Sequence, residues 1–143
     1  MLELSDMLQR KNRVIIDTNL WISFILTGKF SKLDKILNDG SIVLLFSTEL
    51  LDEFIEVARR PKFRKYFPEE DLIKLLHQIE KNAEFIDVEF EVNKCRDPKD
   101  NFLLSLAHDG RATHLISGDK DLTSIEKFGD TVILSLAEYL GKK

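Results

Sequence analysis

The stretch that most constrains the fold runs from Arg13 to Leu20 and reads Arg-Val-Ile-Ile-Asp-Thr-Asn-Leu. Its three consecutive apolar residues predict a short strand that is buried on both faces. The strand ends at Asp17, and the carboxyl ends of parallel strands form the edge at which open α/β folds bind ligands. A lone buried carboxylate is costly unless it is paired or binds a metal, although Asp is also a favoured helix N-cap. Taken alone, this stretch supports a helix cap and a functional site about equally.

Apolar runs alternate with helical patterns along the rest of the chain. The predicted strands share β-branched and apolar residues and lie at 14–16, 42–46, 85–92, 114–117 and 131–134. The stretch at 85–92 alternates, which suggests either a strand nearer an edge or a strand and its exit loop. The predicted helices between and after them lie at 19–26, 33–37, 50–58, 68–82, 98–109 and 121–127, with a last helix opened by the capping box Ser135-x-x-Glu138. This alternation predicts an α/β fold with a central parallel sheet of about five strands and helices on both faces.

Length and composition indicate one globular domain. The chain has 143 residues, of which 43% are hydrophobic, enough for a sizeable core. We expect a single domain over residues 13–143, preceded by an N-terminal arm or short amphipathic helix over residues 1–12. The single Cys95 excludes an intramolecular disulfide, and no apolar run approaches the roughly 20 residues that span a membrane. A cytoplasmic protein without a membrane partner is therefore expected.

The net charge of −4 has the wrong sign for a protein that binds nucleic acid by electrostatics alone. A divalent metal would neutralise part of that charge. Cations are also concentrated at residues 59–65, where five of seven positions are Lys or Arg. This run is either a solvated helix end that complements the helix dipole or a patch that faces phosphates. The candidate phosphate contacts are Arg59, Arg60, Lys62 and Arg64.

Two acidic positions are predicted to meet at one edge of the sheet, and a third lies near that edge or the opposite one. Asp17 and Asp119 follow the first and fourth predicted strands, so a parallel sheet places both at the same edge. Asp100 lies in the first turn of the helix that Asp97 and Pro98 open. The preference for an acid at the start of a helix explains Asp97 as the N-cap. Because Asp97 already caps the helix, a second acid at Asp100 is not needed there, which favours a functional role for Asp100.

A fourth acid comes from the helix at 50–58. At about 100° per residue, Glu53 lies closest to the border of the apolar stripe, with a small margin over Asp52. Glu53 is therefore the best candidate to face a cleft.

Carboxylates gathered at one edge repel one another, and a divalent cation resolves that conflict. Ligands that are all oxygen suit Mg²⁺ or Mn²⁺ better than zinc. His77, His108 and His114 lack the spacing of zinc ligands, and Cys95 has no identifiable base beside it and is best explained by packing.

Four short motifs carry a resemblance to a known family. They are Ile-Asp-Thr-Asn at 16–19, Ser-x-x-Leu-x-x-Glu at 47–53, Arg-Asp-Pro-x-Asp at 96–100 and Ser-Gly-Asp-Lys-Asp-Leu at 117–122. In this order and spacing they resemble the PIN domain family, and the likeness extends over residues 13–140. Within the family the chain is most similar to the VapC-like toxins of toxin–antitoxin systems, in which Arg-Arg-Pro-Lys-Phe also follows the acidic helix.

The resemblance implies a three-layer α/β/α fold and an endoribonuclease that hydrolyses single-stranded RNA with Mg²⁺ or Mn²⁺. It assigns the metal and catalytic roles to Asp17, Glu53, Asp100 and Asp119, with support from Asn19, Asp97, Ser117 and Asp121. The partners that it implies are RNA, a cognate antitoxin protein and a second copy of the chain in a homodimer. The number of metals stays open, as does whether Glu53 binds a second metal or positions a water.

Two other interpretations are considered. In an aspartate phosphotransferase of the haloacid-dehalogenase type, Asp17 would be the nucleophile. Such enzymes place a second Asp two residues later, where this chain has Asn19. A catalytically quiet module that binds RNA or a protein is the other alternative, and the presence of all four acids gives no sign of lost activity.

Overall fold

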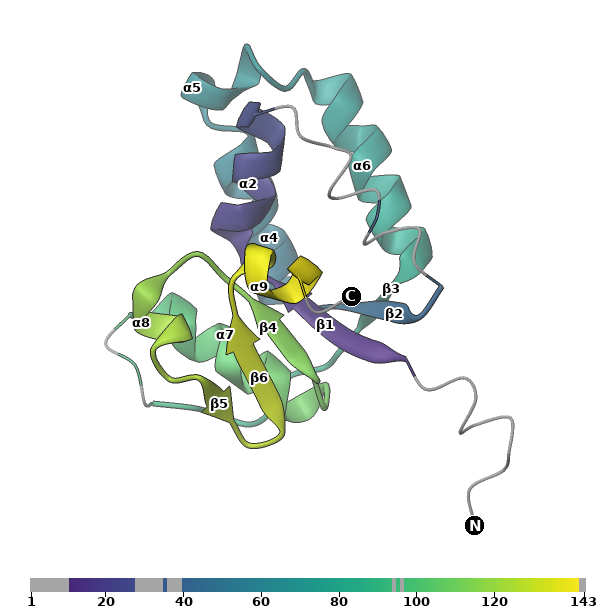
Figure 1. The fold of residues 1–143 in the computed structure, drawn as a ribbon. Coiled ribbons are helices and arrows are strands. Elements are labelled where there is room, and N and C mark those ends of the chain that lie inside the picture. Colours follow the sequence, from purple (N-terminus) through teal and green to yellow (C-terminus); the bar gives the residue numbers. More distant parts are fainter. Residues whose placement is uncertain (1–10, 28–34, 36–39, 94, 96, 142–143) are drawn as a thin grey trace.

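The computed structural model describes residues 11–27, 35, 40–93, 95 and 97–141. The predicted arm and the helix predicted at 33–37 fall largely outside these residues. The described elements, labelled in Figure 1, are β1 (Asn12–Ile16), α2 (Thr18–Thr27), β2 (Ile42–Phe46), α4 (Thr48–Ala58), α5 (Pro61–Arg64), α6 (Glu69–Asn82), β3 (Ala83–Phe85), α7 (Pro98–Asp109), β4 (His114–Ile116), α8 (Lys120–Thr123), β5 (Lys127–Phe128), β6 (Thr131–Leu134) and α9 (Leu136–Gly141).

The strands form one sheet in the order β3-β2-β1-β4-β6-β5, and every neighbouring pair is parallel except β5 with β6. The predicted α/β fold is therefore confirmed. The first strand, β1, is buried on both faces as expected, since Val14, Ile15 and Ile16 are almost fully inaccessible. Its neighbours are β2 on one side and β4 on the other. The strand order thus reverses at β1, and such a reversal opens a crevice at the carboxyl ends of the strands.

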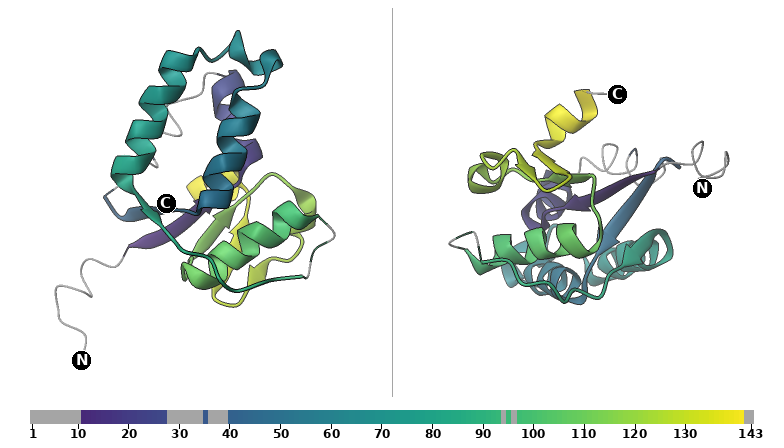
Figure 2. Two further views of the ribbon diagram at one scale, coloured as in Figure 1. Left: turned by 180° about the vertical axis from the view of Figure 1, so that it is seen from behind. Right: turned by 90° about the horizontal axis from the view of Figure 1, so that it is seen from below.

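Helices cover both faces of this sheet. In Figure 1, α9 lies in front of the sheet and α7 behind it, and the two views of Figure 2 agree. The helices α2, α4, α5 and α6 project from the side of the sheet formed by β1, β2 and β3 (Figure 1). The ring of Trp21 joins this projection to the sheet, since it packs 5.8 Å from both Phe46 of β2 and Phe54 of α4. Among the helices of the described residues, none combines the length and the apolar character needed to cross a bilayer.

Two predicted elements differ from the structure. The sheet has a sixth strand, the short antiparallel β5, where the sequence predicted the end of a helix at 121–127; that helix, α8, stops at Thr123. The strand predicted at 85–92 is misplaced, because pairing with β2 involves residues 83–85. Beyond them, Ile86 donates one further hydrogen bond to Phe46 O at 2.8 Å.

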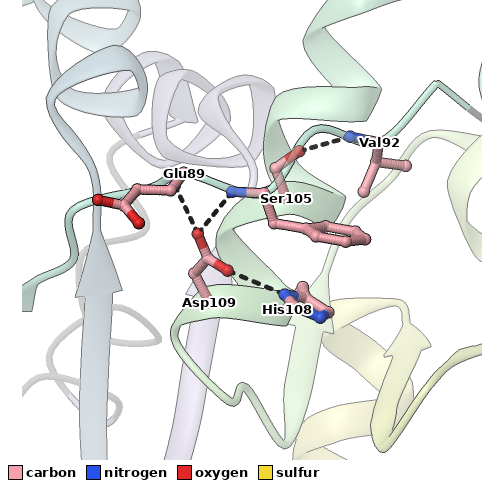
Figure 3. A network of polar contacts seen from close by, with 6 residues as sticks. Glu89, Val92, Ser105, His108 and Asp109 are labelled. Carbon is pink, nitrogen blue, oxygen red and sulfur yellow. Dashed lines mark hydrogen bonds and ion pairs between the residues drawn. The ribbon is translucent and has the colours of Figure 1, made fainter.

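The reason that pairing stops is visible in the polar contacts of α7 (Figure 3). Asp109 Oδ2 accepts hydrogen bonds from the backbone N–H groups of Glu89 (2.6 Å) and Phe90 (3.0 Å). Ser105 Oγ accepts one from the backbone N–H of Val92 at 3.2 Å. Side chains of α7 thus bind backbone N–H groups that would otherwise be free to pair with a neighbouring strand. Residues 88–93 form an extended strap along α7 in place of a strand.

Candidate metal-binding site

Asp17 leaves β1 at the point where the strand order reverses. It is 7% exposed, and its two carboxylate oxygens have different partners. Oδ2 accepts a hydrogen bond from Ser117 Oγ at 2.8 Å, while Oδ1 accepts one from the backbone N–H of Asn19 at 3.3 Å. Asp17 therefore does cap α2, as one interpretation expected. It is also tied to the end of β4, which a cap does not require.

The residues after β4 continue this arrangement. Ser117 is fully buried, and its Oγ also accepts a hydrogen bond from the backbone N–H of Asp119 at 3.0 Å. Asp119 in turn caps α8 by accepting from the backbone N–H of Asp121 at 2.9 Å. One hydroxyl thus couples the carboxylate at the end of β1 to the turn that carries Asp119.

The carboxylates of four elements line one pocket. Its volume is about 40 Å³, and it is lined by Asp17, Glu53, Asp97, Asp100 and Asp119 together with Thr18, Asn19, Lys99 and Leu103. A volume of this size accommodates a cation with a bound water, because one water needs only about 10–15 Å³ of accessible space. The structure therefore brings together the four acids to which the family resemblance assigned a metal role, along with Asn19 and Asp97.

The helix α7 delivers two of these acids in different environments. Asp97 caps the helix, since its Oδ1 accepts from the backbone N–H of Lys99 at 3.0 Å, and its predicted capping role is confirmed. Asp100, one turn into the helix, is only 5% exposed. Burial raises the pKa of Asp100 to about 6, and the negative charges of Asp119, Asp97 and Asp17 add to that rise. The pocket therefore holds more negative charge than its own residues neutralise.

The pKa of Asp17 is raised as well. Burial raises the pKa of its carboxyl, and the charge of Asp119 acts with burial, while the hydrogen bond from Ser117 opposes both. Two acids of one pocket thus have raised pKa values. Raised pKa values of neighbouring acids in one pocket are typical of functional sites.

Glu53 enters the pocket from α4, whereas its neighbour Asp52 is exposed and does not line it. Glu53 Oε1 lies 3.5 Å from the ammonium of Lys99. Lys99 is the only cationic residue among the described residues that line the pocket. It partly offsets five carboxylates and leaves a large excess of negative charge.

The donor set fits a hard divalent cation. The available ligands are carboxylate oxygens, as Mg²⁺ and Mn²⁺ prefer, and none of the described His or Cys residues lines the pocket. Thr18 is 2% exposed and its Oγ1 is buried with no hydrogen-bond partner among the described residues, so the pocket wall holds an unused oxygen. Within the described ranges, no three Asp, Glu, His or Cys side chains form a ready cluster of metal ligands. Metal binding would therefore require the carboxylates to move closer together.

Other predicted site residues lie outside this pocket. Asp121 is exposed on α8 and does not line it. Of the cationic run, Arg59 and Arg60 follow α4, while Lys62 and Arg64 belong to α5 at the far end of that helix (Figure 1). Two of these cations form ion pairs, which were not predicted: Arg59 with Glu69 at 2.7 Å and Arg60 with Glu56 at 3.6 Å.

Sequence reasoning missed Lys99 and Thr18. Both are adjacent to predicted acids, and Lys99 is the only cation between the two acids of the 97–100 turn. A cation in the first turn of a helix opposes the helix dipole, and this unfavourable placement was the available signal. The buried, unpartnered hydroxyl of Thr18 becomes apparent only in three dimensions.

Comparisons with known proteins agree with the geometry of the sheet and the pocket. The profile described as PIN domain matches residues 13–121. An uncharacterized protein of Methanocaldococcus jannaschii, MJ1680, is 33% identical over 118 residues, which cover 80% of this chain and 76% of that protein.

A solved structure is similar in fold. It is the crystal structure of VapBC2 from Rickettsia felis bound to a DNA fragment from their promoter, with a TM-score of 0.55 and 14% identity. The match covers 85% of this chain and 96% of the matched chain. The profile match spans most of the chain and all four predicted acids. The chain therefore belongs to the PIN domain family.

Proposed function

We propose that this protein is a divalent-metal-dependent endoribonuclease that hydrolyses phosphodiester bonds of single-stranded RNA. The observation that carries the proposal is the pocket in which Asp17, Glu53, Asp100 and Asp119 meet. Membership of the PIN domain family supports a nuclease activity, because nucleases are typical of that family.

The roles of the residues follow from their surroundings. Asp17, Asp100 and Asp119 would hold Mg²⁺ or Mn²⁺, because Asp17 and Asp100 are buried and the charges of Asp119 and Asp17 both raise the pKa of Asp100, a repulsion that a cation would offset. The bound metal would supply Lewis-acid chemistry, lowering the pKa of a water and offsetting charge on the phosphate. Ser117 would act as a positioning residue by fixing Asp17 and the turn of Asp119 at once. Glu53 would orient the attacking water or hold a second cation.

The outer part of the RNA path is proposed to follow α4. Glu53, Glu56 and Arg60 are three, four and seven residues apart along this helix and its end, so they lie on one side of it. At 1.5 Å per residue, the cationic run begins about 10 Å from the pocket. RNA phosphates would reach Lys62 and Arg64, which have no ion pair among the described residues.

The proposal also includes protein partners. We propose that the protein is the toxin of a toxin–antitoxin pair and forms a homodimer. The likeness in fold to a chain of the VapBC2 complex supports the toxin–antitoxin assignment, while the homodimer follows from the family resemblance. Co-expression with the product of the adjacent gene, followed by size-exclusion chromatography, tests it. A stable complex with reduced nuclease activity is expected, and two proteins that elute separately without inhibition would contradict it.

A cleavage assay tests the central activity. Purified protein is incubated with single-stranded RNA, double-stranded RNA and single-stranded DNA in Mg²⁺, Mn²⁺, Zn²⁺ or EDTA. We expect cleavage of single-stranded RNA in Mg²⁺ or Mn²⁺, none in EDTA, and none with the Asp119→Asn variant. RNA binding without cleavage would instead favour the catalytically quiet module. Trapping of a phosphate on Asp17 would favour the phosphotransferase.

A further inference from the structure

A second, larger pocket lies next to the carboxylate pocket. It has a volume of about 380 Å³, which is within the range of pockets that hold small ligands. One wall is the strap at residues 88–93, and the other is the first two turns of α7. Ser47 and Glu49, at the start of α4, also line it. None of the acids proposed as metal ligands lines this second pocket.

The two pockets share both of their helices. Along α7, the second pocket is lined by Pro98, Asn101, Phe102 and Ser105, whose spacing of three, four and seven residues defines one helical stripe. The carboxylate pocket is lined by the neighbouring stripe that contains Asp100. Along α4, Glu49 of one pocket and Glu53 of the other are one turn apart, about 6 Å along the helix axis. This distance is comparable to the length of one nucleotide in an extended strand.

The second pocket carries two phenylalanines with accessible rings. Phe90 is 45% exposed and Phe102 is 52% exposed, so both keep much of their apolar surface in water. Aromatic side chains of this kind act as stacking platforms for unpaired bases. Single exposed apolar side chains are common on protein surfaces, but two exposed rings that line one pocket form an apolar patch, which favours a binding role.

The position of Phe90 is fixed before any ligand arrives. Its backbone N–H donates a hydrogen bond to Asp109, and its ring stacks on His108 with centroids 3.8 Å apart and planes 17° from parallel. His108 Nδ1 lies 2.9 Å from the second oxygen of Asp109, so the same carboxylate holds both the backbone and the stacking partner. A platform that is already ordered loses little conformational entropy when a ligand binds.

The charge of the second pocket determines which part of a nucleotide can enter. Its lining includes Glu49, Glu89 and Glu91, while none of the described lining residues is Lys or Arg. A phosphate would be repelled. A neutral base can enter, and its N–H groups can donate to carboxylates, as cytosine and guanine amino groups do.

We propose that this second pocket is a nucleobase subsite. It takes one unpaired base of the RNA, stacked on Phe90 and Phe102, while an adjacent phosphate lies at the carboxylate pocket. The inference rests on the proposed ribonuclease function, since the continuity of the two pockets is what favours RNA over other ligands. Bases rich in N–H donors, guanine above all, bind better there than uracil.

The test removes the base and the platform separately. A single-stranded RNA whose cleavage position has been mapped is synthesised with one abasic nucleotide at each position around the scissile bond, and kcat/KM is measured for each substrate. With the wild type, loss of the base at one fixed position should lower kcat/KM by about 5-fold to 150-fold. With Phe102→Ala or Phe90→Ala, the same abasic substitution should cost less than about twofold, because the stacking has already been lost.

Phe85→Ala is the matched control. Phe85 is 43% exposed, carries the same side chain and does not line the second pocket. This variant should show the full effect of base removal. Equal base-removal penalties in the wild type and in both pocket variants would overturn the nucleobase subsite while leaving the ribonuclease function intact.

A binding measurement distinguishes failure of the subsite from failure of the proposed function. The same RNAs are added to ¹⁵N-labelled Asp119→Asn protein in Mg²⁺, and the amide signals of residues 88–93 are followed by NMR. Shifts that the abasic RNA fails to produce would support the subsite even if no cleavage is found. If RNA leaves the amide signals of residues 88–93 unchanged and a cationic peptide shifts them, the proposal is overturned in favour of a protein partner.

Discussion

The hydroxyl of Ser117 donates a 2.8 Å hydrogen bond to Asp17 Oδ2 across 100 residues of sequence. The same oxygen accepts from the backbone N–H of Asp119 at 3.0 Å. A fully buried side chain thus links the ends of two adjacent strands and two of the proposed metal ligands. Partners that orient metal ligands in this way commonly affect metal affinity nearly as much as the ligands do.

The first prediction follows from this link. Ser117→Ala removes the donor to Asp17 and leaves the N–H of Asp119 unpaired, which should cost about 1–3 kcal/mol in the free energy of unfolding. Mn²⁺ affinity should fall by about 10-fold to 100-fold. Urea denaturation and isothermal titration calorimetry measure the two effects. Ser117→Thr keeps the hydroxyl and is the control. Unchanged Mn²⁺ affinity in the alanine variant would remove Ser117 from the site.

The second prediction concerns pH. Asp100 has an ordinary pKa of 3.8 and a folded-state pKa of about 6, so the folded protein binds its proton more tightly than the unfolded chain does. The resulting stabilisation is complete below about pH 4 and is lost as the pH rises through 6. Asp100→Asn removes this dependence. In EDTA, the variant should melt at least about 3 °C above the wild type at pH 7.

That difference should shrink toward zero as the pH falls to 4. Asp71→Asn, at an exposed acid in the first turn of α6, provides the control and should show no such increase. A wild type and an Asp100→Asn variant whose melting temperatures stay parallel from pH 4 to pH 7 would contradict a charge conflict at Asp100.

The third prediction separates Lys99 from the metal ligands. Its ammonium lies 3.5 Å from Glu53 Oε1 and competes with any cation for that carboxylate. Lys99→Gln should therefore tighten Mn²⁺ binding by on the order of 3-fold to 10-fold at low salt. Lys120→Gln is the control, because Lys120 follows Asp119 in sequence but does not line the pocket. Weaker Mn²⁺ binding in the Lys99 variant would contradict a competing role.

The fourth prediction tests the cationic run. Lys62 and Arg64 have no ion pair within the described part of the chain, while Arg59 and Arg60 do. If both unpaired cations contact phosphates, the double variant Lys62→Ala/Arg64→Ala should lower the logarithmic salt slope of RNA binding by about 1.4, or roughly 0.7 per contact. Lys81→Ala, at an exposed cation of α6, should leave the slope unchanged. An unchanged salt slope in the double variant would indicate that the cationic run is a solvated helix end without phosphate contacts.

The sequence predicted the fold well where residues are buried on both faces. Apolar runs such as Ile42–Phe46 leave few alternatives to a central parallel strand, and the caps at Asp97 and Ser135 follow local rules. The misplaced strand at 85–92 shows the limit of this reasoning. Its alternating pattern is typical of an edge strand, yet its N–H donors are taken by Ser105 and Asp109, which are distant in sequence.

The candidate site was likewise predictable where local patterns and strand topology decide, and not where distant residues meet. The convergence of Asp17 and Asp119 follows from strand topology alone, and helix periodicity indicated Glu53 over Asp52. The ion pair of Lys99 with Glu53 joins the second turn of α4 to the first turn of α7. No local pattern encodes that distance, so the compensating cation could be found only in the structure.

The most direct test of the account is the rate of Mn²⁺-dependent cleavage of single-stranded RNA by Asp17→Asn beside Asp52→Asn. Asn preserves the cap of α2 but is a poorer metal ligand, so the Asp17 variant should fold, melt no lower than the wild type in EDTA and gain less stability from Mn²⁺. Asp52 is exposed outside the pocket and controls for the loss of one charge. We predict that Asp17→Asn is nearly inactive and that Asp52→Asn cleaves at the wild-type rate. Cleavage by Asp17→Asn at the wild-type rate would contradict the account.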